Sequence, residues 1–251
     1  MSTTNHPAHT LFACAAVAAL AATVYGAGQS GPAAAPPAAA PVAVELMSFL
    51  SGPAERPMLP TELHGDPDEA SNYWNQQNFQ DCGLMAVATV VGLTTGTAPS
   101  EQEIVAVASS LPSPGENRPI YTPPDPNNPN SDNGTTSEEQ IVLLKHYGIN
   151  ATATDDGLAA ETGLPTGIPA LPGYLDSGRR LIVGVNAETI WAEEGGYDAD
   201  DHSVVLTGVD PEAGVVFLSD SGTEDGDGEQ VPIDVFERAW AVGGHDLIVA
   251  G

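Results

Sequence analysis

The sequence YWNQQNFQDCGLMAVATVVGLTTG, residues 73–96, decides how the rest of the chain is interpreted. It begins as an aromatic and polar loop and continues, after one cysteine, into a segment that is apolar on almost every side: Leu84, Met85, Val87, Ala88, Val90, Val91 and Leu93. A helix without a polar face belongs in the interior of a domain. The stretch therefore predicts a central buried helix that begins near Cys82.

Cys82 lies where the first turn of this helix would present unpaired backbone N–H groups. These groups and the helix dipole favour the thiolate, which is the nucleophilic form of cysteine. Asp81 is expected to cap the helix. Gln76 and Gln77, six and five residues before the cysteine, could each direct an amide N–H at an oxyanion. A buried structural cysteine would give the same local pattern, so the stretch alone does not decide between the two.

The composition limits the range of partners. The 251 residues are enough for one domain of moderate size. Residues 1–44 contain no Asp, Glu, Lys or Arg, so the 34 acidic and 6 basic residues, and the net charge of −28, belong to the remainder. Such a surface argues against binding nucleic acid or an anionic membrane through a basic patch. It is typical of a secreted protein or of a protein in high salt.

The N-terminal part is predicted to be a targeting segment and a linker. Residues 11–27 form an apolar run of 17 that is short for a membrane span and is followed by small residues. We interpret residues 1–27 as a secretory signal peptide or a retained N-terminal anchor, although residues 1–10 lack Lys and Arg. The Ala/Pro-rich residues 28–44 predict a linker, and residues 45–251 the remaining domain. Removal of the signal would leave Cys82 as the single cysteine.

Beyond the central stretch, helical and strand patterns follow one another as in an α+β domain. Capping boxes at Ser100 with Glu103 and at Thr136 with Glu139 predict two helices, over about 101–111 and from 136 to Gly148. A short helix is expected near 170–177, and a short strand followed by a helix over 231–240. The other expected strands are 181–185, 202–209, 215–220 and 247–249, and the expected loops are 112–135, 191–201 and 221–229.

Residues 202–220, HSVVLTGVDPEAGVVFLSD, form a hairpin by pattern and supply two partners for the cysteine. The turn is centred near residues 211–212, so position 202 is expected to face about positions 220–221. Nearest cross-strand neighbours have Cβ atoms about 4.5–5.5 Å apart, close enough for His202 and Asp220 to meet on one face. The carboxylate could then orient the imidazole, and the imidazole could take the thiol proton of Cys82.

The pattern YW-x-QQ-x4-CG, the later HSVVLTGVD and the hydrophobic strand that ends in Asp resemble the papain-like cysteine peptidases related to the bacteriocin-processing, double-glycine leader family. The C-terminal VPIDVFERAW followed by a strand is also similar to that group. The resemblance covers about residues 64–251. It implies a papain-like α+β fold in which a central helix packs on an antiparallel sheet. It also implies Cys82 as nucleophile, His202 as base, Asp220 as orienting acid, and Gln76 with the Cys82 backbone N–H as oxyanion donors.

The resemblance further implies hydrolysis of a peptide or protein substrate through a thioester, without a metal or an organic cofactor. Three features depart from the family. Ser221 stands where proline is common, no fused transporter domain is expected, and a long acidic loop precedes His202. The double-glycine substrate is therefore not carried over. A cell-wall peptide amidase with the same triad and an inactive binding module of the same fold are the alternative interpretations.

Other residues compete for roles in the site. Gln77 is the alternative to Gln76, and Asp201 precedes His202 but is expected on the other face of the strand. The acidic clusters within 198–201 and 220–229 could bind Ca²⁺ through oxygen ligands, although neither fits a helix-flanked calcium loop and solvated loops are expected. His64 and His245 have no partner at a metal-ligand spacing. Trp74 belongs either beside the cleft or in the core.

Overall fold

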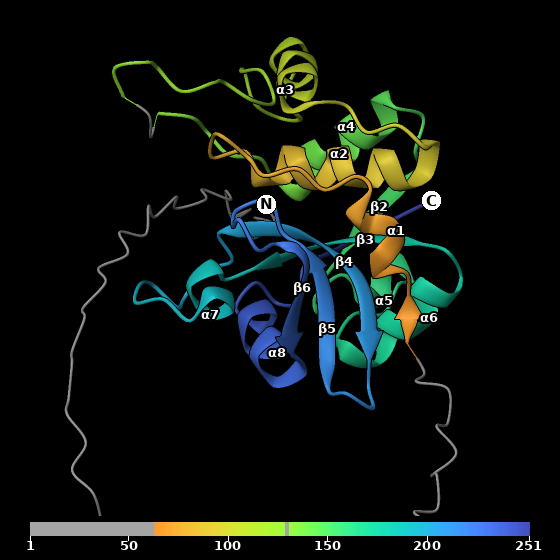
Figure 1. The fold of residues 1–251 in the computed structure, drawn as a ribbon. Helices are drawn as coiled ribbons and strands as arrows, with labels where there is room; N and C mark the ends of the chain where they lie inside the picture. The colour runs from red at the N-terminus through yellow and green to blue at the C-terminus, as the bar shows by residue number, and fades with distance from the viewer. Residues whose placement is uncertain (1–62, 129–130) are drawn as a thin grey trace, which may run out of the picture. The chain divides into compact units, whose positions relative to one another are not determined.

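The structure, a computed structural model, describes residues 63–128 and 131–251 (Figure 1). The predicted signal or anchor and the linker lie outside these residues. Among the described helices, none combines the length and apolar character needed to cross a membrane. The elements follow one another as β1 (His64–Gly65), α1 (Pro67–Ser71), α2 (Cys82–Thr95), α3 (Glu101–Ser110), α4 (Ser137–His146), β2 (Ala151–Thr154), α5 (Ala159–Thr162), the 3-10 helix η1 (Ile168–Ala170), α6 (Leu171–Asp176), β3 (Arg180–Val185), α7 (Ala187–Trp191), β4 (His202–Asp210), β5 (Val215–Ser219), β6 (Asp227–Pro232), α8 (Ile233–Ala241) and β7 (Leu247–Ala250).

Helix α2 is the helix that the apolar run predicts. Every residue from position 82 to position 93 is buried. The helix packs on β3 and β4 and is covered by α3 and α4, so its first three turns have no solvent face. It ends at Thr95, because Gly96 takes a left-handed conformation with φ of 81°. The predicted α+β arrangement, in which a central helix packs on an antiparallel sheet, is confirmed.

The sheet is antiparallel throughout. Its strands are hydrogen-bonded in the order β2-β7-β3-β4-β5-β6, and the short β1 pairs with the C-terminal end of β4. Although β7 is the last of these strands in the chain, it lies between β2 and β3. Strand β4 is buried along its whole length, as expected for a strand with a packed layer on each face.

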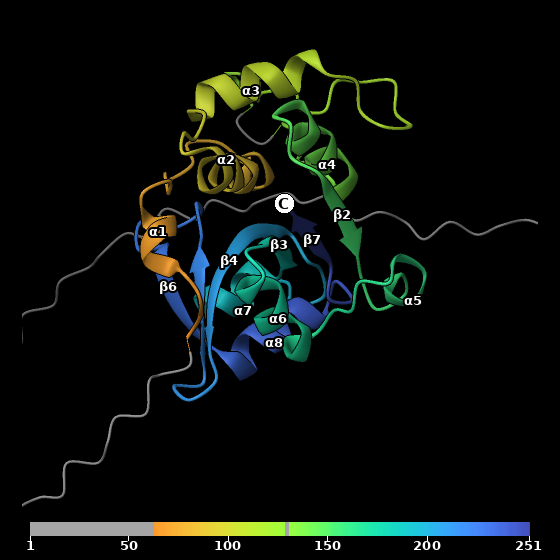
Figure 2. The ribbon, with the colours of Figure 1, turned by 90° about the vertical axis from the view of Figure 1, so that its right-hand side faces the viewer.

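Two hydrophobic cores lie on the two faces of the sheet, with α2, α3 and α4 on one side and α6 and α8 on the other (Figure 2). Successive residues of a strand point to opposite faces, so the central strands contribute alternately to both cores. Ile182, Val205 and Ile248 pack in the core with α2, whereas Leu181, Val183, Val204, Leu206, Leu247 and Val249 pack in the core with α8. This double coverage explains why β3, β4 and β7 read as nearly continuous apolar runs.

Both predicted capping boxes are confirmed. Ser100 Oγ accepts from the Glu103 backbone N–H at 3.3 Å, and Glu103 Oε2 accepts from the Ser100 backbone N–H at 2.8 Å. Thr136 and Glu139 form the same reciprocal pair at the start of α4. Glu139 is buried and also forms an ion pair of 2.9 Å with Arg118. This ion pair ties the long loop before α4 to the helix itself.

The structure corrects several local expectations. The short elements α1, β2 and α7 were not expected, and β6 begins at Asp227, inside the expected loop 221–229. The hairpin register also differs. Val205 faces Ser219, and the pairing shifts between Leu206 and Gly208, so position 202 lies opposite residues just after Asp220. The difference arises at the turn: Asp210 faces Val215, so the turn is centred between residues 212 and 213, about one residue later than expected, and the bulge between Leu206 and Gly208 moves the pairing back by one residue.

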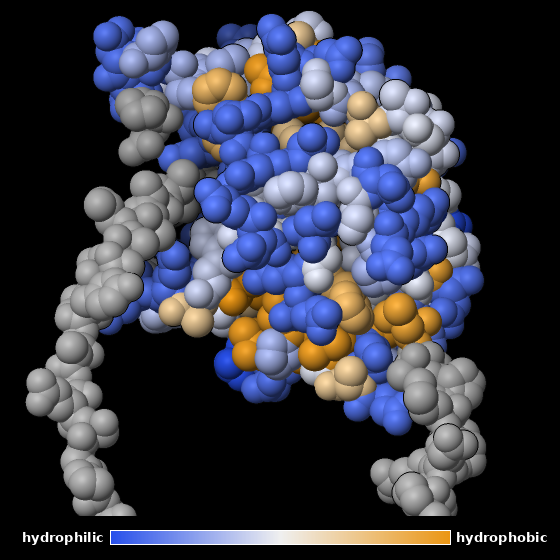
Figure 3. Space-filling model, viewed as in Figure 1, coloured by the Kyte–Doolittle hydropathy of each residue, from blue (hydrophilic) through white to orange (hydrophobic). Residues whose placement is uncertain are grey.

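Hydrophilic residues cover most of the face shown in Figure 3, and apolar residues gather toward its lower edge. Some large apolar side chains are nevertheless exposed among the described residues, including Phe79, just before α2, and Tyr197, in the acidic loop before β4.

Candidate active site

Cys82 is the first residue of α2, and its side chain is buried against β4. The backbone N–H of Ser203 donates to Sγ of Cys82 at 3.5 Å. Because that nitrogen is bonded to the carbonyl carbon of His202, the sulfur lies within about 6 Å of the His202 Cα. The structure therefore brings the expected nucleophile and the expected base into one site.

His202 and Asp220 form a buried pair at the open end of the β4–β5 hairpin. Nε2 of His202 lies 2.6 Å from Oδ1 of Asp220, and neither side chain has exposed surface. The backbone N–H of Gly222 donates to the same carboxylate oxygen at 2.7 Å. Asp201 instead accepts from the Ala187 backbone N–H at 3.0 Å, which makes Asp220 the carboxylate that holds the ring.

The electrostatics of this pair favour its charged form. Burial alone would lower the pKa of His202, but the charge and the hydrogen bond of Asp220 raise it above its ordinary value. Burial alone would likewise raise the pKa of Asp220, but the charge and hydrogen bond of His202 lower it below the usual range. An imidazolium held by a carboxylate is the species that a thiolate needs beside it.

Trp191, the last residue of α7, completes the surroundings of the pair. Its Nε1 donates to Oδ2 of Asp220 at 3.0 Å, and its ring centroid lies 5.1 Å from that of His202. A β-carbon at Gly222 would stand 2.7 Å from the Trp191 ring, so glycine is required where this loop crosses the pair. Sequence reasoning missed Trp191 because nothing in its neighbourhood marks a site, and α7 itself was not expected.

The loop before α2 is tied to the acid end of the hairpin by three bonds. Trp74 Nε1 donates to the backbone carbonyl of Asp220 at 2.6 Å. The Gln77 backbone N–H donates to the Ser221 carbonyl at 2.9 Å, and the Ser221 hydroxyl donates to Gln77 Oε1 at 2.7 Å. Trp74 therefore lies beside the site, which answers the choice that the sequence left open. These contacts join the segment before the cysteine to the segment after the acid.

The two glutamines differ in how they are held. Gln77 is half-buried, and besides the bond from Ser221 its Nε2 donates to the Phe79 carbonyl at 2.9 Å, so its amide is committed to the loop. Gln76 is exposed, and among the described residues no hydrogen bond fixes its amide. The role of Gln76 as an oxyanion donor stays a prediction, and the alternative donor Gln77 is engaged elsewhere.

The start of α2 is packed too closely for any side chain at position 83. A β-carbon at Gly83 would overlap Thr135 Oγ1 and would stand 2.6 Å from Gln140 Nε2. Gln140 is itself buried, and its Nε2 donates to the Ser203 hydroxyl at 3.1 Å. Thr135 and Gln140 thus fix the first turn of α2 against the strand that carries His202. Neither residue could be recognised from sequence, because both belong to an ordinary helix start.

The oxidation state of the cysteine bears on its chemistry. Cys82 is disulfide-bonded in the structure. Cys14, the other cysteine of the chain, lies outside the described residues. Because only a thiolate is nucleophilic, acyl transfer at Cys82 requires the reduced side chain.

Two further carboxyls near the site, those of Asp81 and Glu229, have raised pKa values. Asp81 occupies the N-cap position of α2, but its side chain makes no capping hydrogen bond, contrary to the expectation from sequence. Burial, followed by the charge of Glu101, raises the pKa of Asp81 to about 7. Burial, followed by the charge of Asp220, likewise raises the pKa of Glu229 on β6 to about 7, although the charge of His202 opposes this.

The histidines and acidic residues of the described part are not grouped as metal ligands. Within residues 63–128 and 131–251, no three His, Cys, Asp or Glu side chains are grouped so that they could hold a metal ion. His64 instead contacts Asp176 at 2.9 Å. His245 contacts Asp156 at 2.8 Å and Glu237 at 3.2 Å.

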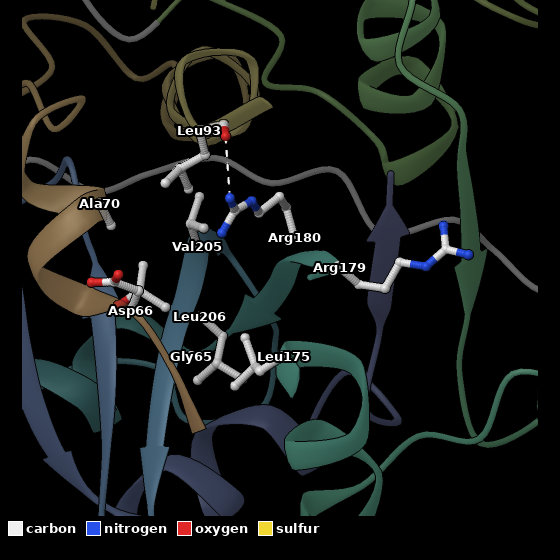
Figure 4. Close-up of a pocket in the computed structure, with 10 residues that line it drawn as sticks. Gly65, Asp66, Ala70, Leu93, Leu175, Arg179, Arg180, Val205 and Leu206 are labelled. Atoms are coloured by element: carbon white, nitrogen blue, oxygen red, sulfur yellow. Dashed lines mark hydrogen bonds between the residues drawn. The ribbon is translucent and has the colours of Figure 1, made fainter. Parts of the chain in front are cut away.

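Two cavities lie away from the cysteine and the histidine. One, of about 20 Å³, is lined by Asp66, Leu93 and Arg180 among others, and Arg180 donates to the Leu93 carbonyl at 3.2 Å beside it (Figure 4). Its volume is that of a single water molecule. The other, of about 500 Å³, lies between α6 and the β2–β7 edge of the sheet, lined by residues such as Tyr174 and Arg179. Neither contains a residue of the candidate active site.

Comparison with known proteins gives close relatives and distant structural neighbours. No protein-family model matches the chain. It is 46% identical over 193 residues to the protein Rv1268c of Mycobacterium tuberculosis and to Mb1299c of Mycobacterium bovis, both named as uncharacterized proteins. The match covers 74% of this chain and 83% of each relative.

Two solved structures are similar to the chain at lower levels. A proposed C39-like peptidase from Bacillus anthracis aligns with a TM-score of 0.46 and 19% identity over 72% of this chain and 95% of its own. A double-glycine motif protease from an AMS/PCAT transporter, crystallised with the leader peptide, aligns with a TM-score of 0.38 and 16% identity over 70% and 88%. Likeness at these levels does not assign an activity.

Proposed function

We propose that this chain, which belongs to the family of the mycobacterial protein Rv1268c, is a cysteine peptidase that hydrolyses peptide or protein substrates. The observation that carries the proposal is the fully buried His202–Asp220 pair, 2.6 Å apart, next to the amide that contacts Cys82 Sγ. A carboxylate-held imidazole beside a cysteine at a helix start is the arrangement that thiol-dependent acyl transfer requires.

In the proposed reaction the side chains act in a fixed order. The proton of the Cys82 thiol passes to Nδ1 of His202, since Nε2 is engaged by Asp220. The thiolate attacks the carbonyl carbon of the scissile amide, and the resulting oxyanion is held by the Cys82 backbone N–H and the amide of Gln76. His202 returns its proton to the leaving amine. Water, deprotonated by His202, then hydrolyses the thioester and restores the thiol.

One observation favours a second candidate, a binding module of the same fold without turnover. Gln76 is exposed, and among the described residues no hydrogen bond holds its amide in place. A peptidase needs an oxyanion donor in a fixed position, whereas a binding module does not. The two candidates therefore differ in whether the protein with a free thiol at Cys82 cleaves a peptide.

The test uses the full chain carrying Cys14→Ser, so that Cys82 is its single cysteine, with reductant present. A thiol-directed activity probe should label this protein, and a peptide library should be cleaved. Cys82→Ala should abolish both, and His202→Ala should abolish cleavage while thermal unfolding stays cooperative. Asp234→Asn is a matched control, because it removes an exposed carboxylate that pairs only with Arg238 on α8. Absence of cleavage by the reduced parent protein, with full folding, would favour the binding module.

We further propose that the peptidase acts outside the cytoplasm as a stand-alone domain, either released or held by its N-terminal segment. The support is the charge-free, apolar residues 11–27, the Ala/Pro-rich residues 28–44 and the acidic remainder. Fractionation of cells that express the full chain should recover it from the medium or the envelope. Recovery only from the cytoplasm, at full length, would contradict this part of the proposal.

A further inference from the structure

The side chain of Asp81 is the buried acid closest in sequence to the proposed nucleophile. It is 1% exposed, and among the residues that the structure describes neither of its carboxyl oxygens has a hydrogen-bond partner from another residue. Its backbone carbonyl accepts from the N–H groups of Leu84 and Met85, at 2.8 and 3.1 Å, which fixes the residue at the start of α2. The backbone thus holds the residue in place, and only its own backbone N–H favours the charged form of the carboxyl, which does not outweigh burial.

The groups around Asp81 make that cost larger. The charged side chains that act on it are Glu101, from the start of α3, and Asp132, from the loop before α4, and both are acidic. The hydroxyl of Tyr121, from the loop after α3, also faces this cluster and donates to Asp132 Oδ2 at 3.2 Å. Burial and these like charges account for the raised pKa of Asp81, about 7. The side chain therefore changes charge near neutral pH.

When Cys82 is reduced and ionised, its thiolate is a second negative charge at the residue next to Asp81. Two like charges in a buried site repel each other far more strongly than they do in water. Groups coupled in this way titrate together, so that ionising one makes the other harder to ionise. Residues 81 and 82 are joined by one peptide bond, so their Cα atoms lie about 3.8 Å apart, and both side chains are buried. At such a separation in a buried site, a negative charge on the carboxyl opposes ionisation of the sulfur.

We propose that the Asp81 carboxyl is a proton-linked control of the Cys82 nucleophile: its neutral form lets the thiolate form, and its carboxylate opposes the thiolate. The proposal rests on the proposed function only in taking Cys82 as the nucleophile. It assigns Asp81 a positioning role, because it acts through Cys82 and does not touch the substrate. The peptidase would work best where Asp81 is neutral, at slightly acidic to neutral pH, and would lose rate on the alkaline side.

The experiment measures the ionisation of the thiol without any turnover. The full chain carrying Cys14→Ser is reduced, the reductant is removed, and the rate of alkylation of Cys82 by iodoacetamide is followed by intact mass across the pH range. The same profile is taken with Asp81→Asn, which keeps the shape of the side chain and cannot ionise. Asp81→Ser serves if the asparagine variant does not fold. Asp234→Asn is the control for loss of one carboxylate elsewhere.

We expect the ionisation constant of the Cys82 thiol to be at least fivefold larger in Asp81→Asn than in the parent. The midpoint of the alkylation profile should therefore lie about 0.7 pH unit lower. The midpoint should not shift in Asp234→Asn. Equal midpoints in the parent, Asp81→Asn and Asp81→Ser would overturn the proposal. Because alkylation needs no substrate, its outcome is independent of cleavage. A shifted midpoint in a protein that cleaves nothing would reject the peptidase and keep the control of the thiol.

Discussion

Trp191 Nε1 donates a 3.0 Å hydrogen bond to Oδ2 of Asp220, the carboxylate oxygen that His202 does not use. The tryptophan therefore fixes the rotation of the carboxylate while its ring packs beside the imidazole. Trp191→Phe keeps the aromatic ring and removes only the donor. We expect kcat/KM to fall about 10- to 150-fold, since a hydrogen bond to a charged group contributes about 1.5–3 kcal/mol. Kinetics with a cleaved peptide, together with a thermal melt within a few degrees of the parent, would check this.

Asp220→Asn should reduce kcat by about 10²- to 10⁴-fold, because an amide no longer favours the imidazolium or the productive tautomer. Asn keeps the size of the side chain, so the fold should persist. Single-turnover acylation with a peptide ester separates the attack from deacylation. Full activity in a correctly folded Asp220→Asn protein would remove the acid from the mechanism.

The same variant should be destabilised in a pH-dependent way. The raised pKa of His202 adds stability that is fully present below its ordinary value of 6.5 and is lost as pH rises through the raised value. The lowered pKa of Asp220 adds stability that is present above 3.8 and is lost as pH falls through the lowered value. Urea unfolding should therefore show a larger loss for Asp220→Asn at about pH 5.5 than at about pH 9. Equal losses at both pH values would contradict a charged pair.

Gly83→Ala should disturb the start of α2 more than most glycine substitutions. The new β-carbon would overlap Thr135 Oγ1 and press on Gln140, which is buried. We expect a loss of about 1–3 kcal/mol in the free energy of unfolding, as for other overpacked positions, and a slower reaction at Cys82. Gly173→Ala on α6 is the matched control, because a β-carbon there meets no atom within 4 Å. That variant should be neutral or slightly stabilised.

Asp81→Asn should gain stability relative to the parent as pH rises. The raised pKa of Asp81 means that its neutral form stabilises the fold fully below 3.8, and that this contribution is lost as pH rises toward about 7. The difference between variant and parent should therefore grow from about pH 4 to about pH 8 and then level off. Denaturant midpoints across that range would show it, and a constant difference would mean that Asp81 ionises normally.

Much of this fold could be predicted from sequence because its signals are local. The apolar run after Cys82 indicates a buried helix, and the reciprocal Ser–Glu and Thr–Glu spacings indicate two helix starts, all of which the structure confirms. The hairpin was also found, because its turn and its two apolar runs are adjacent in the chain. Short elements such as β2 and α7 were missed, since they are stabilised by neighbours far away in sequence rather than by their own pattern.

The residues of the candidate site likewise differ in how far the sequence could identify them. Cys82, His202 and Asp220 carry reactive groups at element ends, and the residues alone suggested bringing them together. Trp191, Gln140 and Asp81 matter through what surrounds them, which a sequence does not state. The sequence predicts Asp81 as a helix cap, whereas in the structure its side chain makes no capping hydrogen bond and is buried without a hydrogen-bond partner among the described residues.

The place of β7 between β2 and β3 has a consequence for biosynthesis. A nascent chain whose residues 247–250 are still inside the ribosome has β2 and β3 already outside, with the slot between them empty. β2 then lacks β7, the strand through which it is hydrogen-bonded to the rest of the sheet. The part of the sheet on which α4 packs is therefore incomplete. Final assembly of this domain must therefore wait until synthesis has passed its last strand.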